Sequence, residues 1–233
     1  MTKEEFILNC QQNGLDLSFD QLENLNKYYH LLSEKNKVMN LTAIIEENEV
    51  YEKHFYDSLL FSFQVNLNNT NLIDVGSGAG FPGLVIAICY PQCEVTLVEP
   101  LMKRCSFLQC VIDELKLSNV KVINARAEDL TSYREKFSFA TARAVARLNI
   151  LLELIMPLLK VGGTFIALKG RLGHEEIKEA ENALKVLNCD VDRIQEINLL
   201  TENDTRINIF IKAKKHIEKK YPRNYSQIKK KPL

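Results

Sequence analysis

The chain has 233 residues, 46% hydrophobic and 26% charged, and its 30 basic and 30 acidic side chains cancel to a formal net charge of zero. This balance excludes a protein that coats nucleic acid over its whole surface by bulk charge. The longest apolar stretch, residues 148–159, contains a Glu and a Pro and is too short to cross a bilayer.

Residues 1–66 are predicted to form an N-terminal helical extension. Capping boxes of the S/T-x-x-E/Q type occur at 2–5 and at 18–21, and each marks the first turn of a helix. Leu and Tyr recur at three- and four-residue steps in the second helix, which predicts an amphipathic helix that packs on another surface. We expect a further helix over 47–63 and a domain boundary in the polar segment 66–71.

Residues 67–214 alternate short β-rich runs with helical ones, which predicts an α/β, doubly wound, mostly parallel sheet. The predicted strands are 71–76, 94–99, 119–124, 137–142, 163–170, 190–197 and 206–213. The predicted helices are 82–90, 101–115, 148–159 and 173–188. Since no helix separates the last two strands, we expect an antiparallel hairpin that leaves the last strand reversed at the edge of the sheet.

Charge is distributed unevenly along the chain. Residues 212–233 carry nine Lys or Arg and one acid, a net charge of +8, which leaves −8 for residues 1–211. The end of the chain, 215–233, is therefore predicted to be a basic tail whose cations and two tyrosines contact a polyanion.

The glycine-rich segment D-V-G-S-G-A-G at 74–80 is the sharpest motif in the chain. It follows a predicted strand and opens a helix, where Gly76, Gly78 and Gly80 let a ligand lie against bare backbone. Glu99 ends the next strand, and a carboxylate there can accept both hydroxyls of a ribose. The pair predicts a site for a nucleoside-containing ligand.

Two ligand classes fit this loop. The segment 78–83 formally matches the G-x-G-x-x-G pattern of NAD-binding proteins, but a two-domain dehydrogenase needs a substrate domain for which the chain has no room. The D-x-G-x-G-x-G form with a strand-terminal acid favours S-adenosylmethionine, which has no pyrophosphate.

The six cysteines form no C-x-x-C pair and have no histidine at zinc-ligand spacing. Together with the charged N-terminus, which is unlike a signal peptide, they indicate reduced thiols in a cytoplasmic protein without a metal site.

Several short motifs, taken together, resemble the RsmG (GidB) family of bacterial methyltransferases, which modify a guanine of 16S ribosomal RNA at N7. The motifs are NLTAI (40–44), KHFYDSLL (53–60), DVGSGAGFPGL (74–84), RAEDL (126–130), TARAVARL (141–148), KG (169–170) and the terminal YPR and KKKPL. The resemblance covers nearly the whole chain and implies a Rossmann-like methyltransferase sheet that uses S-adenosylmethionine.

The resemblance also implies roles for single residues. It implies that Gly76 and Phe81 contact the cofactor, Glu99 holds its ribose, Ala127 and Glu128 flank its adenine, and Arg143 reaches its methionine end or the incoming base. Its implied partner is 16S ribosomal RNA or the small ribosomal subunit, and we expect a monomer that binds neither membrane nor metal.

Guanine N7 carries a lone pair and no proton, so methyl transfer to it needs no general base. We therefore assign no catalytic side chain, and Arg143 and Lys169 stay as candidates. The predicted RNA contacts are Arg147, Lys169, His54, Lys219, Lys220 and Arg223. Removal of 219–233 is expected to weaken RNA binding and leave cofactor affinity intact.

Two other functions stay open from the sequence alone. One is an NAD-dependent oxidoreductase. In that case, binding of NAD rather than of S-adenosylmethionine would protect the protein. The other is a non-catalytic RNA-binding or ribosome-assembly module, which would bind RNA without transferring a methyl group.

Overall fold

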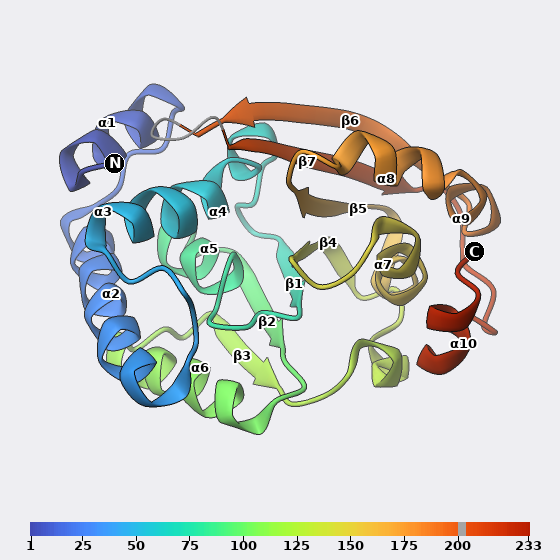
Figure 1. Ribbon diagram of the computed structural model, residues 1–233, viewed down its shortest axis with the longest axis horizontal. Helices are drawn as coiled ribbons and strands as arrows, with labels where there is room; N and C mark the ends of the chain where they lie inside the picture. Colours follow the sequence, from blue (N-terminus) through green and yellow to red (C-terminus); the bar gives the residue numbers. More distant parts are fainter. Residues whose placement is uncertain (200–203) are drawn as a thin grey trace.

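The computed structural model of the protein describes residues 1–199 and 204–233, which form a seven-stranded sheet covered by helices on both faces (Figure 1). The strands are β1 (Asn71–Val75), β2 (Glu94–Val98), β3 (Val120–Ile123), β4 (Phe137–Arg143), β5 (Leu159–Lys169), β6 (Cys189–Asn198) and β7 (Thr205–Ala213). Their order is β3-β2-β1-β4-β5-β7-β6, and β1 to β5 pair in parallel. The predicted doubly wound, mostly parallel sheet is confirmed.

The position of the reversed strand differs from the prediction. Strand β7 is antiparallel to both neighbours, as expected, but it lies between β5 and β6 and is not at the edge. Five consecutive residues of β7, 207–211, are buried, whereas β6 is largely exposed. A strand that is buried along its length needs neighbours on both sides, so the more polar β6 takes the edge.

The N-terminal extension begins with α1 (Lys3–Gln12) and α2 (Phe19–Met39), and both predicted capping boxes are formed. The helix expected over 47–63 is less regular: α3 (Glu47–Val50) runs into a π-helical turn (Tyr51–Tyr56) and then α4 (Asp57–Leu59). Single π-helical turns are frequent at functional sites because they redirect side chains.

Two hydrophobic clusters fill the space on the two sides of the sheet. The N-terminal extension, α5 (Gly83–Cys89) and α6 (Met102–Leu115) enclose one cluster. The other lies under α7 (Leu148–Ile155), α8 (Gly173–Glu179), α9 (Glu181–Val186) and α10 (Tyr225–Lys230). The single helix predicted over 173–188 is thus divided at Ala180 into α8 and α9.

The C-terminal segment folds against the domain. Ile217, Tyr221 and Ile228 are buried in the cluster under α7, and α10 lies beside α7 in Figure 1. The Arg134 guanidinium donates to the backbone oxygens of Ile217 and Tyr221. Residues 215–233 are therefore part of the same packed structure, because their apolar side chains complete its core.

Within the described ranges, no helix is long and apolar enough to cross a membrane. The same residues contain no group of three or more His, Cys, Asp or Glu side chains placed to hold a metal ion. All six cysteines are unpaired, and five of them are buried.

Candidate active site

The glycine loop is held by hydrogen bonds to strands β1, β2 and β4. The amides of Gly76 and Ser77 donate to the Val98 oxygen at 2.8 and 3.1 Å. The buried Asp74 carboxylate accepts from the Gly83 amide at 3.1 Å and from the Thr141 hydroxyl at 2.9 Å. Burial raises the pKa of Asp74 to about 6 despite these donors. Asp74, on β1, thus ties the end of the glycine loop to β4.

The three glycines of the loop have different neighbours, although all have positive φ, at +74°, +59° and +102° for Gly76, Gly78 and Gly80. A Cβ on Gly76 would lie 2.5 Å from Val145 Cγ2, and one on Gly80 would lie 2.4 Å from Leu84 Cδ1. At Gly78 the nearest atom would be 3.9 Å away. The close neighbours leave no room for a side chain at Gly76 or Gly80, whereas the space at Gly78 is open.

Glu99 lies directly after β2 and is almost fully buried. Its carboxylate accepts from the Gly78 amide at 3.0 Å and from the Leu101 amide at 2.9 Å, and Arg104 Nη1 is 3.9 Å away. The backbone donors fix the orientation of this carboxylate at the wall of a cavity.

A cavity of about 410 Å³ opens beside Glu99, at the carboxyl ends of β1 and β2. Of the predicted cofactor residues, Gly76, Glu99, Ala127 and Glu128 line it. Gly78, Gly80, Phe81 and Arg143 lie outside this lining. Leu154 and Tyr225 also line the cavity, and sequence reasoning missed them because they lie far from the motif in the chain.

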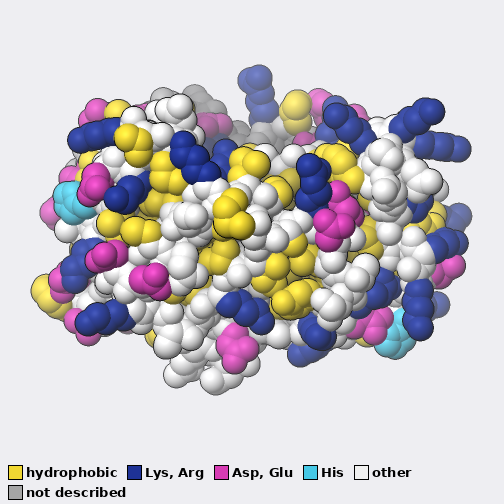
Figure 2. All heavy atoms as spheres, turned by 90° about the horizontal axis from the view of Figure 1, so that it is seen from below, with side chains coloured by type: hydrophobic (Ala, Val, Ile, Leu, Met, Phe, Trp, Pro, Cys, Tyr) yellow, Lys and Arg dark blue, Asp and Glu magenta, His cyan; other side chains and the backbone are white. Residues whose placement is uncertain are grey.

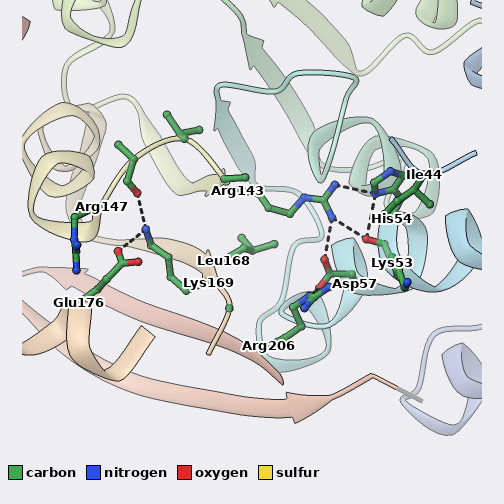
Figure 3. A pocket seen from close by; sticks show the side chains of 14 residues that line it. Ile44, Lys53, His54, Asp57, Arg143, Arg147, Leu168, Lys169, Glu176 and Arg206 are labelled. Atoms are coloured by element: carbon green, nitrogen blue, oxygen red, sulfur yellow. Dashed lines mark hydrogen bonds and ion pairs between the residues drawn. The ribbon is translucent and has the colours of Figure 1, made fainter. Parts of the chain in front are cut away.

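A second cavity, of about 700 Å³, adjoins the first, and the two share Ala144 and Val145. Figure 3 shows two groups of charged side chains on opposite sides of the second cavity, with Leu168 between them. Its lining carries five cationic and two acidic side chains, namely Lys53, Arg143, Arg147, Lys169 and Arg206 against Asp57 and Glu176. The second cavity therefore has an excess of positive charge that suits a polyanion.

Arg143, the last residue of β4, is the centre of the charged group that faces the N-terminal extension. Its Nη1 donates to Asp57 Oδ2 at 2.9 Å and to the Lys53 oxygen at 3.1 Å, and its Nη2 lies 3.3 Å from His54 Nδ1. Arg206 Nε donates to the other Asp57 oxygen at 3.1 Å. Asp57 is thus shared by two arginines, which holds both guanidinium groups at the cavity wall.

His54 and Phe81 attach the extension to the glycine loop. The His54 ring stacks on Phe81 at 4.3 Å between centroids, and its Nε2 lies 2.8 Å from Thr42 Oγ1. Burial and, second, the nearby Arg143 lower the pKa of His54 to about 3. His54 is therefore neutral, with Nδ1 accepting from Arg143 and Nε2 donating to Thr42, since a guanidinium can only donate.

Lys169 faces the second cavity from the end of β5. Its ammonium group donates to the Ala146 oxygen at 2.6 Å and forms an ion pair with Glu176 at 2.7 Å. Glu176 also accepts from the Leu148 amide at 2.8 Å, and burial lowers the pKa of Lys169. Lys169 therefore fixes the loop 144–147, which separates the two cavities.

The remaining predicted RNA contacts differ in exposure. Arg147 is exposed and pairs with Glu179 at 2.7 Å, and Lys219 and Lys220 are also exposed. Arg223 instead pairs with Glu153, whose side chain is fully buried, at 2.6 Å. The Arg223 guanidinium is used inside the fold, because the buried carboxylate requires a partner.

Sequence reasoning also missed Arg206, Glu176 and Val145, which line the second cavity. Arg206 lies 149 positions from its partner Asp57. No local spacing could have joined these two residues.

The model of one protein family, described as rRNA small subunit methyltransferase G, matches residues 21–205 of this chain. The chain belongs to this family. Ribosomal RNA small subunit methyltransferase G of Leuconostoc citreum is 42% identical over 239 residues, and that of Ligilactobacillus salivarius is 44% identical over 240, each covering 100% of both chains. The Mycoplasma capricolum protein of the same name is 46% identical over 88% of each chain.

Solved structures show the same fold at lower identity. TYW2 of M. jannaschii, in complex with AdoMet, has a TM-score of 0.58 at 14% identity and covers 73% of this chain and 79% of its own. A SAM-dependent methyltransferase of Aquifex aeolicus has a TM-score of 0.57 at 14% identity, with coverages of 78% and 97%. The family's methyltransferase fold is therefore present in this chain.

Proposed function

We propose that this member of the family transfers a methyl group from S-adenosylmethionine to N7 of a specific guanine in 16S ribosomal RNA. The observation that carries the proposal is the pair of adjoining cavities. One cavity lies at the glycine loop beside Glu99, the other is lined by an excess of cations, and they meet at Ala144 and Val145. A nucleoside-containing methyl donor and an RNA base can thus meet between them.

The first cavity fits the adenosyl part of the cofactor. Glu99 supplies a carboxylate for the ribose hydroxyls, and Ala127 with Glu128 forms the wall that we assign to the adenine. Gly78, at φ +59°, directs its backbone amide to the Glu99 carboxylate and so holds the loop against the residue that we assign to the ribose. Contacts from Gly76, Gly80 and Phe81 would come from their backbone, since the Phe81 ring is buried under His54.

When bound, S-adenosylmethionine supplies an electrophilic methyl group. The described residues at the cavity junction need only orient the guanine, because its N7 lone pair attacks without loss of a proton. Arg143 is held at the wall by Asp57 and His54, and its guanidinium suits guanine O6 or the carboxylate of the cofactor. Because His54 is neutral, its Nδ1 can accept a hydrogen bond from Arg143, which a protonated ring could not do.

The RNA contacts that we propose lie on two parts of the surface: Arg147, Lys169 and His54 line the second cavity, whereas Lys219 and Lys220 lie on the C-terminal segment that Arg134 holds. Exposed Arg147, Lys219 and Lys220 are placed to contact phosphates, while Lys169, His54 and Arg223 act by holding loops and side chains in position. In Figure 2, which views the molecule from below, hydrophobic side chains lie across the middle of the face, with Lys, Arg, Asp and Glu side chains around them.

We further propose that the protein acts as a monomer in the cytoplasm, on 16S RNA or on the small subunit. The decisive experiment incubates the full chain with labelled S-adenosylmethionine and unmodified small-subunit RNA or small subunits, and maps the labelled base. Label at guanine N7 is the expected result. Label at another atom would refute the substrate, and RNA binding without label would refute the activity.

A further inference from the structure

The C-terminal helix α10 contributes an aromatic side chain to the cavity at the glycine loop. Tyr225, its first residue, lines that cavity together with Leu154 of α7 and Ala127. We propose, resting on the function proposed above, that the Tyr225 ring contacts the adenine of the cofactor. The basic C-terminal segment would then be part of the cofactor site as well as of the RNA surface.

The position of Tyr225 within the cavity points to the adenine and not to the methionine end. Tyr225, Ala125 and Ala127 all pack against the hydrophobic cluster under α7. The methionine end must approach Ala144 and Val145, where the second cavity begins, because the methyl group has to reach the RNA base. An aromatic ring at the other end offers a π-face on which a purine can stack.

Two anchors hold Tyr225 in place. On one side, Arg223 donates to Glu153 from its backbone amide at 2.9 Å, from Nε at 2.7 Å and from Nη2 at 2.6 Å. Glu153 precedes Leu154, so this pair ties the C-terminal segment to the helix that lines the cavity. On the other side, Ile228 is fully buried. A ring between two fixed points is preorganised for binding.

The same helix presents cations to solvent. Lys229 and Lys230 of α10 are exposed, and among the described residues neither has an ion-pair partner. Because Tyr225 lies within 219–233 and lines the cavity, removal of this segment should no longer leave cofactor affinity intact. We now expect that deletion to weaken both RNA binding and cofactor binding.

The test uses the absence of tryptophan from the chain. Tyr225→Trp introduces a single tryptophan at the cavity, and Tyr29→Trp introduces one on α2, where the half-buried Tyr29 lines neither cavity. Titration with S-adenosylhomocysteine should change the fluorescence of the first variant with a saturation curve and leave the second unchanged. A purely structural role for Tyr225 would not place the reporter against the ligand. A silent Trp at 225 with cofactor bound would overturn the proposal.

Affinity measurements provide an independent test. By calorimetry, Tyr225→Ala should bind S-adenosylmethionine roughly tenfold more weakly, as expected for loss of an aromatic stacking partner. Tyr225→Phe, which keeps the ring, should restore the affinity, and Tyr29→Ala controls for the loss of a half-buried tyrosine elsewhere. Thermal unfolding confirms that each variant is folded. If wild type binds the cofactor and Tyr225→Ala binds it equally well, this inference fails alone. If wild type does not bind it, the proposed function fails.

Discussion

The Arg223–Glu153 ion pair attaches the C-terminal segment to α7, and its contribution to the free energy of unfolding can be measured. The Glu153 side chain is 0% exposed and the Arg223 side chain 26%. Arg223→Met removes the two hydrogen bonds that Nε and Nη2 donate to this carboxylate and keeps the one from the backbone amide. Loss of one partner from a buried ion pair costs about 3–5 kcal/mol, and the partial exposure of Arg223 favours about 3 kcal/mol.

For a chain of this length, each kcal/mol lowers Tm by about 2–4 °C, so Arg223→Met should lower it by roughly 6–12 °C. Calorimetry or circular dichroism measures the change. Arg147→Met is the matched control, because the Arg147–Glu179 pair has side chains 54% and 46% exposed. An exposed pair contributes about 0–1 kcal/mol, so this variant should move Tm by about 4 °C or less.

The double variant Glu153→Met with Arg223→Met separates burial of an unpaired charge from loss of packing. It removes both charges, so it should recover most of the stability that Arg223→Met loses. A Tm for Arg223→Met within about 2 °C of wild type would refute the reasoning. A double variant no more stable than the single one would show that the cost comes from packing and not from the carboxylate.

Three further predictions follow from the site. Gly78→Val should abolish cofactor binding, because a β-branched residue is strained at φ +59° and the loop would lose the geometry that joins its amide to Glu99; a normal calorimetric titration would contradict this. Asp57→Asn removes the carboxylate shared by Arg143 and Arg206 and should lower methyl transfer roughly tenfold or more with little change in cofactor affinity; unchanged transfer rates would exclude the positioning role. His54 has its folded-state pKa lowered to about 3 from 6.5, so its neutral form contributes stability that is fully present above pH 6.5 and is lost as pH falls towards 3. Relative to His54→Gln, wild type should therefore lose about 2 kcal/mol in denaturant unfolding between pH 7 and pH 5, and a constant difference would argue against a buried neutral ring.

The sequence predicted structure well where the interaction joins residues that are close in the chain. Both capping boxes form as predicted, since each joins residues only three positions apart. The parallel sheet could be predicted from alternating apolar runs, and Gly76 with Glu99 could be predicted from their places at strand ends. Hydrophobic periodicity did not predict which of the last two strands lies at the edge of the sheet. That position depends on which strand buries more surface and not on which comes last in the chain.

By itself, the sequence determined the fold class, the glycine loop and its acidic partner, and the basic excess after residue 212. Only the tertiary structure decided which charges face the cavities. It pairs Asp57 with Arg206 across 149 positions and assigns Arg223 to a buried carboxylate. It also brings Tyr225 to the cavity at the glycine loop. The physical reason is that ion pairs and cavity walls depend on packing between distant segments, which charge counts along a chain do not record.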